Sequence, residues 1–276
     1  MVEQHPDAAH NLRVSPFGRR GYADEYQRGR PPVPDAVLAL LCQYARVERP
    51  RLVIDLGCGT GLSTLPWLTV ADRVVGVEAE PAMLAVARSQ AAAVDWREGR
   101  AHQTGLPAAC ADVVTCVQAF HWMDPTVTLP EIGRLLQPGG VFAAIDYDGP
   151  PSVDWELERA AATFVAEVLR RGRERGVSRP DWRFWPKEGH LDRLRQSGYF
   201  GYVREVVMHG EMVRDADWFV NGTINNGLDG LEPFRAAGLS DEDLGVPAYR
   251  ALVERVVGAG RRCFLGFRIR FGVTCP

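Results

Sequence analysis

Short apolar runs alternate with amphipathic segments through the middle of the chain. The apolar runs are brief and rich in β-branched residues, as is typical of buried strands, and lie at 52–56, 73–77, 94–96, 112–117 and 141–146. The amphipathic segments carry apolar residues at helical spacing and lie at 62–70, 80–90 and 129–136. Strands that alternate with helices predict an α/β protein, with a parallel sheet covered by helices on both faces.

The pattern differs on either side of this region. The first fifty residues are polar apart from one apolar helix expected at 35–44. After residue 147 we expect an amphipathic helix over 154–171, a short helix at 191–196, a strand near 202–208, a helical segment to 260 and a final strand at 262–273. We therefore expect an N-terminal lid segment (1–45), an α/β core (46–148), a helical cap insertion (149–198), and C-terminal core strands (199–276) with a helical insertion at about 210–259.

Composition narrows the class of function. The 276 residues carry a net charge of −3, which argues against a nucleic-acid partner, because non-specific binding needs a basic surface. No apolar run is long enough to span a membrane, and the first residues hold no apolar signal-peptide core. The six cysteines form no C-x-x-C pair, which is typical of a reducing compartment. We therefore expect a cytoplasmic monomer or homodimer with neither a nucleic-acid nor a membrane partner.

The stretch VIDLGCGTGLS, residues 53–63, runs from an apolar strand into a glycine-rich turn. A dinucleotide turn needs a third glycine where this chain has Leu62, and a phosphate loop needs a lysine that is absent. Asp55, buried at the strand end, would repel a pyrophosphate and attract an ammonium group, directly or through water. Gly57 and Gly59 let a ligand approach the backbone. The turn therefore predicts a ligand at the carboxyl end of a strand that is not held by its phosphates.

The Asp-x-Gly-x-Gly-x-Gly order of this turn resembles the first motif of the class I S-adenosylmethionine-dependent methyltransferases. Four more segments resemble later motifs of that family in the right order, namely VVGVE (74–78), EPAML (80–84), ADVV with QAFHW (111–114 and 118–122) and LLQPGG (135–140). The resemblance implies a Rossmann-like fold with a mostly parallel seven-stranded sheet, an antiparallel final strand and helical caps. It also implies S-adenosylmethionine as cofactor, with S-adenosylhomocysteine as product.

A finer resemblance is to the bacterial small-molecule branch that includes trans-aconitate methyltransferase-like proteins, with a methyltransferase type 11 domain. It rests on QAFHW and on the N-terminal pattern Tyr26-x-x-x-Arg30-Pro31-x-x-Pro34. In that branch, segments like GRAHQTGLP (99–107) usually carry an acid where this chain has His102. Backbone groups near 100–102 are then the alternative partner for the adenine amino group. The branch implies a small-molecule methyl acceptor.

The resemblance also implies a set of cofactor-binding residues. In this set, Glu78 accepts hydrogen bonds from both ribose hydroxyls, Met83 packs against adenine, and Arg30 holds the cofactor carboxylate. The alternative for Arg30 is that it only lies in a solvated loop. Cys58 is interpreted as a small filler. The full expected set is Tyr26, Arg30, Asp55, Gly57, Cys58, Gly59, Gly61, Glu78, Ala79, Met83, Ala101, His102, Gln118 and Ala119. The histidines His102, His190 and His209 show no ligand spacing, so we expect no metal.

His121 is the candidate catalytic base, because it follows the fourth strand and its ordinary pKa suits the role. A base is needed only when the acceptor is protonated, and the alternative is that His121 orients the loop or lines the cofactor pocket. The expected substrate-binding residues are His121, Trp122, Tyr147, Trp182 and Trp185. The alternative for these aromatic residues is plain packing of a cap on its core.

We therefore expect methyl transfer by in-line displacement to a small molecule, with the accepting atom (O, N, C or S) open. One alternative is a cofactor-binding cyclase or isomerase that does not methylate. A nucleic-acid or protein methyltransferase is less favoured, because Gln118-Ala119-Phe120-His121 does not match the [Asn/Asp]-Pro-Pro-aromatic motif of amino-methylating DNA enzymes.

Overall fold

The computed structural model describes residues 16–18, 21–178 and 184–275. Its centre is a seven-stranded sheet in the order β3-β2-β1-β4-β5-β7-β6. The strands are β1 (Val53–Leu56), β2 (Val74–Glu78), β3 (Asp95–Glu98), β4 (Ala111–Val117), β5 (Leu136–Ser152), β6 (Tyr202–Arg214) and β7 (Arg261–Val273). Neighbours from β3 to β5 are parallel, whereas β7 runs antiparallel to both β5 and β6. The predicted sheet, mostly parallel with an antiparallel final strand, is confirmed.

Both faces of the sheet are buried, which explains why its central strands read as continuous apolar runs. Side chains of neighbouring residues in a strand point to opposite faces. Val53 accordingly packs in a cluster with helix α3 (Asp35–Ala45), while Ile54 packs in a second cluster with α5 (Pro125–Leu135) and α7 (His190–Gln196). A further helix, α4 (Pro81–Gln90), follows β2, and the 3-10 turn η2 (Leu65–Thr69) follows the glycine turn.

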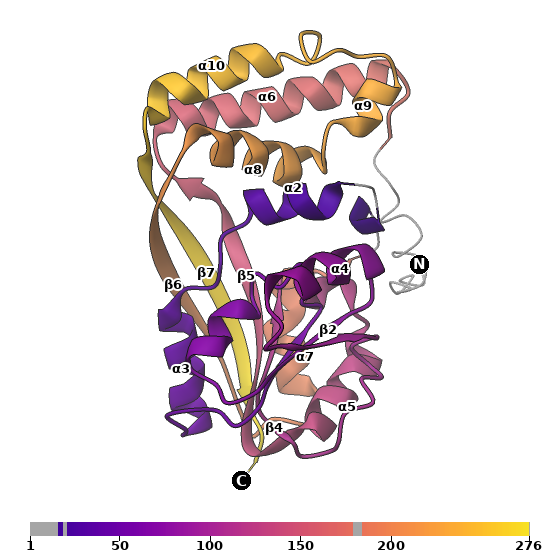
Figure 1. Cartoon of the computed structure of the whole chain (residues 1–276), viewed down its shortest axis with the longest axis vertical. Helices are drawn as coiled ribbons and strands as arrows, with labels where there is room; N and C mark the ends of the chain where they lie inside the picture. The colour runs from indigo at the N-terminus through magenta and orange to yellow at the C-terminus, as the bar shows by residue number, and fades with distance from the viewer. Residues whose placement is uncertain (1–15, 19–20, 179–183, 276) are drawn as a thin grey trace.

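A second helical layer lies beyond one end of the sheet, at the top of Figure 1. It consists of α6 (Trp155–Glu174), α8 (Ala216–Leu228), α9 (Glu232–Ala236) and α10 (Val246–Val257), which share one apolar cluster. The helix α2 (Tyr22–Gly29) lies beside α8, between this layer and the sheet (Figure 1). The long strands β5, β6 and β7 connect the two layers. Helix α2 therefore lies in the space between them.

The observed elements extend some of the sequence expectations. The strand expected at 141–146 spans Leu136–Ser152, and the one expected near 202–208 continues to Arg214. These ends contain polar, glycine and proline residues, so a search for apolar runs does not detect that the strands continue there. The helix expected at 129–136 begins earlier, at Pro125, because Asp124 caps it. The helices α3 and α7 both pack against the sheet, although the division by sequence puts them in the lid and cap segments.

No helix among the described residues has the length and apolar character needed to cross a membrane.

His190, at the start of α7, should make the stability of the protein sensitive to acid. The residue is 1% exposed, and its ring packs edge-on against Phe120 with centroids 4.8 Å apart. Burial, reinforced by Arg193, Arg270 and Lys187, lowers the pKa of His190 to about 3. Between an unfolded pKa of roughly 6.5 and the folded one, the unfolded chain binds a proton that the folded protein does not. Acidification through this range therefore favours unfolding.

As the pH is lowered from about 6.5 to 3, we expect the free energy of unfolding to fall more steeply for the wild type than for His190→Gln. The difference between the two slopes should reach up to about 1.4 kcal/mol per pH unit. Urea denaturation across this range measures the difference. The exposed His209 supplies the matched control, since His209→Gln should follow the wild type. Parallel curves for the wild type and His190→Gln would contradict the assignment.

Candidate functional site

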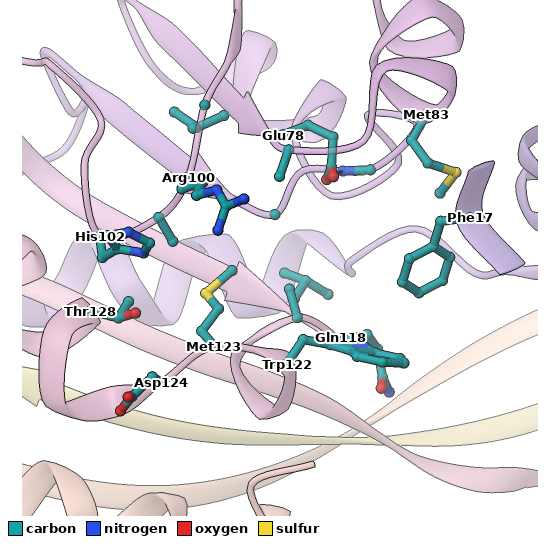
Figure 2. A pocket seen from close by; sticks show the side chains of 18 of the residues that line it. Phe17, Glu78, Met83, Arg100, His102, Gln118, Trp122, Met123, Asp124 and Thr128 are labelled. Atoms are coloured by element: carbon teal, nitrogen blue, oxygen red, sulfur yellow. Dashed lines mark hydrogen bonds between the residues drawn. The ribbon is translucent and has the colours of Figure 1, made fainter. Parts of the chain in front are cut away.

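A cavity of about 340 Å³ opens at the carboxyl ends of β1, β2 and β4. This edge of an α/β sheet is where the fold binds ligands, because several loops and helix N-termini converge there. Figure 2 shows the lining side chains converging from different loops on one space. The lining comprises Phe17, Tyr26, Gly57, Gly59, 77–79, Met83, 99–102, 117–119, 122–124, Val127 and Thr128.

The glycine turn forms one wall of the cavity through Gly57 and Gly59. Both have positive φ, 68° and 56°, which other residues rarely adopt. A Cβ on Gly57 would lie 2.7 Å from the Cβ of Ala119, so only glycine lets the turn approach the loop after β4. Gly61 differs from these two glycines, because its added Cβ would lie 2.7 Å from the Trp96 ring, and it is not among the residues that line this cavity or the small one beside it. Gly61 is therefore required for packing.

Asp55 does not reach the cavity. Its side chain is fully buried, and it accepts hydrogen bonds from the hydroxyls of Ser63 (2.6 Å), Thr64 (2.7 Å) and Thr115 (2.9 Å). Burial raises the pKa of Asp55, and the three hydroxyls lower it again in part. The expectation that Asp55 contacts a ligand ammonium directly is therefore wrong. Its carboxylate instead holds the chain after the glycine turn against β4.

Glu78 is the carboxylate that the end of β2 brings to the cavity. Its Oε2 accepts the backbone N–H of Gly59 and its Oε1 that of Glu80, both at 2.8 Å. Burial raises the pKa of Glu78, and the backbone hydrogen bonds oppose this. Glu78 thus joins the glycine turn to the start of α4 and places a fixed acceptor in the wall. Ala79, Met83, Ala101, His102, Gln118 and Ala119 from the expected set also line this cavity.

A small second cavity of about 20 Å³ adjoins the first one and shares Tyr26, Gly57, Gly59 and Val117 with it. Cys58 and Tyr147 also line it. Burial raises the pKa of the Cys58 thiol well above its ordinary value, which makes the thiol unreactive. The hydroxyl of Tyr147 donates to the carbonyl of Pro31 at 2.9 Å, so this ring also fixes the chain after α2.

Tyr26 and Arg30 differ in their relation to the site. Tyr26 lines both cavities, whereas Arg30 lines neither. The guanidinium carbon of Arg30 lies 4.8 Å from the centroid of the Tyr26 ring, within cation–π distance. Arg30 thus contacts the ring that closes the cavity and does not itself line the space.

His121 lies in η3 (Phe120–Trp122), behind the wall of the cavity, and lines neither space. Its backbone carbonyl accepts the N–H of Trp185 at 2.9 Å, and its Nδ1 lies 3.9 Å from Oδ1 of Asp146. Burial, followed by the charge of Lys187, holds the pKa of His121 well below its ordinary value. The imidazole is therefore neutral near pH 7.

Lys187 connects this region to the sheet. Its Nζ donates to Oε1 of Gln118 at 2.5 Å and lies 3.0 Å from Oδ1 of Asp146. The other oxygen of Asp146 accepts from Nη1 of Arg270 at 3.0 Å, and Arg270 also pairs with Glu205. Gln118, which has a positive φ of 52°, is thus held at the cavity by a chain of charged side chains that reaches β6. Asp146 and Arg270 in this chain are buried, whereas Lys187 and Glu205 are half-buried.

The expected substrate residues separate into two groups. Trp122 lines the large cavity, where its ring lies 5.3 Å from Phe17 and 4.6 Å from Phe184. Tyr147 lines the small cavity. Trp185, like His121, lines neither, and Arg193 lies over its ring. Trp182 falls outside the described residues.

Several lining residues were not identified from the sequence. They are Phe17, Val77, Gly99, the Arg100 side chain, Val117, Met123, Asp124, Val127 and Thr128, and Figure 2 shows several of them around the cavity. Met123 and Asp124 directly follow QAFHW, and Arg100 lies within the segment 99–107. Only their position next to recognised motifs could have identified these residues as part of the site. No residue pattern distinguishes them from other loop residues.

Comparisons with known proteins agree with this geometry. Residues 54–144 match a family described as the methyltransferase domain. Trans-aconitate 2-methyltransferase of Azoarcus sp. is 38% identical over 234 residues, which cover 77% of this chain and 82% of that protein. An uncharacterized methyltransferase of Mycobacterium tuberculosis is 37% identical over 48% of this chain, and the match spans only about half (53%) of that relative.

A solved structure from Anaeromyxobacter dehalogenans, described as a candidate type II methyltransferase, is similar over 90% of this chain and 99% of its own. The TM-score is 0.62 and the sequence identity 25%. The structural similarity to this protein therefore extends beyond residues 54–144 to the helical layer.

Removing the Asp55 carboxylate should destabilise the protein. Asp55→Ala leaves three buried hydroxyls without their acceptor, so we expect the free energy of unfolding to fall by about 2–4 kcal/mol. Chemical denaturation measures this loss. The exposed Asp24 supplies a control, since Asp24→Ala should change stability by less than about 0.5 kcal/mol. Equal stabilities of the two variants would show that Asp55 does not hold the turn.

Proposed function

Because the chain belongs to the class I S-adenosylmethionine-dependent methyltransferases, we propose that it transfers a methyl group from this cofactor to a small molecule. The observation that carries the proposal is the cavity itself, where the Gly57–Gly59 wall and the Glu78 carboxylate face one space of about 340 Å³. An amino-acid-bearing nucleoside needs both features, a backbone wall without side chains and a fixed acceptor for its ribose hydroxyls.

The residues present fit such a cofactor. Glu78 accepts the ribose hydroxyls, because backbone hydrogen bonds already fix its two oxygens in the wall. Met83 and Ala101 supply apolar contact for the base. Tyr26 and the small cavity beyond Gly57 enclose the amino-acid part. When bound, S-adenosylmethionine supplies an activated methyl group, so the chain has mainly to align the acceptor with it and exclude water.

We propose a carboxylic acid as the acceptor, with its oxygen as the attacking atom. A carboxylate is already ionised near pH 7 and needs no base, which agrees with the position of His121 behind the cavity wall. The relative from Azoarcus sp., a trans-aconitate 2-methyltransferase by its name, acts on such an acid. His121 is then a positioning residue that connects the Trp185 segment to the turn after β4 through its carbonyl.

Calorimetry should detect one molecule of S-adenosylmethionine, or of S-adenosylhomocysteine, per chain. Glu78→Gln should weaken this binding by about 1–3 kcal/mol, since a charge-assisted hydrogen bond is lost. Glu98, which pairs with Glu78 in the β2–β3 register but does not line the cavity, provides the matched control. Glu98→Gln should bind as the wild type does. Failure of the wild type to bind either ligand would falsify the proposed function.

His121→Phe should separate a positioning role from a catalytic one. We expect cofactor affinity within a few-fold of the wild type and a turnover reduced by less than roughly tenfold, because the acceptor needs no base. Release of S-adenosylhomocysteine with a panel of di- and tricarboxylic acids measures the turnover. A loss of a hundredfold or more at unchanged cofactor affinity would assign the base to His121 and contradict a carboxylate acceptor.

A further inference from the structure

The only lysine of the chain, Lys187, lies directly behind the large cavity without lining it. Its segment is fixed to the loop after β4, because the backbone N–H of Trp185 donates to the carbonyl of His121 at 2.9 Å. The ammonium contacts two acceptors, Oδ1 of the buried Asp146 at 3.0 Å and Oε1 of Gln118 at 2.5 Å. Of these two partners, only Gln118 lines the cavity. Lys187 therefore reaches the cavity through the Gln118 amide.

The contact with Lys187 fixes which way the Gln118 amide faces. An ammonium carries donors only, so the amide atom that it meets must be the oxygen. The amide nitrogen Nε2 is then the end turned away from Lys187. Nε2 donates no hydrogen bond to any residue that the structure describes, and it is not one of the buried atoms that lack a partner. Because the Gln118 side chain lines the cavity, Nε2 offers unused N–H groups to this open space.

Gln118 lies where the two cavities meet. Val117 lines both cavities, and Ala119 packs against Gly57, which also lines both. In Figure 2, Gln118 lies across the space from Glu78. The proposed function places the ribose at Glu78 and the amino-acid part in the small cavity, so the group that joins them lies toward this junction. Gln118 is thus placed to meet the methyl acceptor.

We propose that the Gln118 amide donates an N–H to the carboxylate of the acceptor acid, and that Lys187 is the positioning residue that orients this amide. The inference rests on the proposed function and names the group that holds its acceptor. One carboxylate oxygen accepts from Nε2, and the other oxygen attacks. That oxygen forms the bond to the methyl carbon while the carbon–sulfur bond breaks with its electron pair on sulfur, and no proton moves.

Lys187 also makes the Gln118 amide a better partner for an anion. An amide whose oxygen accepts from a cation is polarised, which strengthens the donor at its nitrogen. A single amide nitrogen engages one carboxylate oxygen, whereas an arginine fork binds both. A neutral amide with one ammonium behind it therefore attracts a carboxylate and leaves the attacking oxygen free.

Steady-state kinetics with the best-used acid of the di- and tricarboxylic panel tests the role of Gln118. Gln118→Glu keeps the oxygen that faces Lys187 but replaces the N–H donor with a second oxygen, which repels a carboxylate. We expect its KM for the acid to rise about tenfold or more, while its affinity for S-adenosylhomocysteine by calorimetry stays within about threefold of the wild type. Gln196 is exposed on α7 and lines neither cavity, so Gln196→Glu should keep the wild-type KM.

Lys187→Met tests the positioning role, because it removes the ammonium and keeps an unbranched side chain. The Gln118 amide can then turn either end to the acceptor, so we expect the KM for the acid to rise roughly threefold to tenfold at unchanged cofactor affinity. In a Gln118→Ala background, Lys187→Met should raise the KM no further, because Lys187 acts through Gln118. Arg195→Met, at an exposed residue of α7 that pairs with Asp192, should behave as the wild type.

Acetylation of the wild type tests Lys187 without a substitution. Its side chain is 33% exposed and is the only lysine amine of the chain, and acetylation removes its charge. Once mass spectrometry shows the modification, the wild type should have the KM of Lys187→Met. Treated Lys187→Met should keep its own KM, which controls for reaction at the N-terminal amine.

The outcomes separate this inference from the proposed function. If the wild type methylates an acid but Gln118→Glu keeps its KM, or Lys187→Met still raises the KM without Gln118, the inference is overturned and the proposed function stands. If Gln118→Glu instead loses most of its affinity for S-adenosylhomocysteine, Gln118 holds the cofactor and the inference is again overturned. If the wild type binds S-adenosylhomocysteine but methylates no acid of the panel, the carboxylate acceptor and the inference are overturned together. Thermal melting of each variant establishes that it is folded.

Discussion

The site depends on a buried carboxylate that must be fully hydrogen-bonded. Asp55 ends the central strand β1 and has no exposed surface, so an unsatisfied oxygen there would cost several kcal/mol. The hydroxyls of Ser63, Thr64 and Thr115 remove this cost only if the chain after the glycine turn returns against β4. The positive φ angles of the glycines allow that return. The position of the cavity wall follows from this one requirement.

Glu78 completes the same arrangement from the neighbouring strand. Its two oxygens accept one backbone N–H from the glycine turn and one from the start of α4. The two segments that flank the cavity are thus fixed to a single side chain at the end of β2. A carboxylate held in this way loses little conformational entropy when a ligand binds, so its remaining lone pairs are available to hydroxyl groups at low cost.

The sequence predicts those parts of the structure that follow from local pattern. Continuous apolar runs predicted the strands, because both faces of the sheet are buried, and the glycine turn with Glu78 placed the cavity at the correct sheet edge. The roles of individual site residues depend on tertiary contacts, which cannot be predicted from a local sequence pattern. From the sequence, Asp55 is expected to contact a ligand, whereas the structure pairs its carboxylate with three buried hydroxyls. Likewise, the loop motif does not reveal that His121 lies outside the lining of both cavities.

The charges behind the cavity wall bear on which acceptors the enzyme can use. Asp146 and Arg270 are both almost fully buried and pair at 3.0 Å, and Lys187 adds a second cation to Asp146. Buried charges are tolerated when they are paired in this way, and burial of His121, followed by the charge of Lys187, disfavours a protonated imidazole. A histidine whose pKa is lowered is a weaker base, less suited to remove a proton from a hydroxyl or carbon acid. An acceptor that is already an anion avoids that difficulty, which is the physical reason to favour a carboxylate over the other acceptor classes.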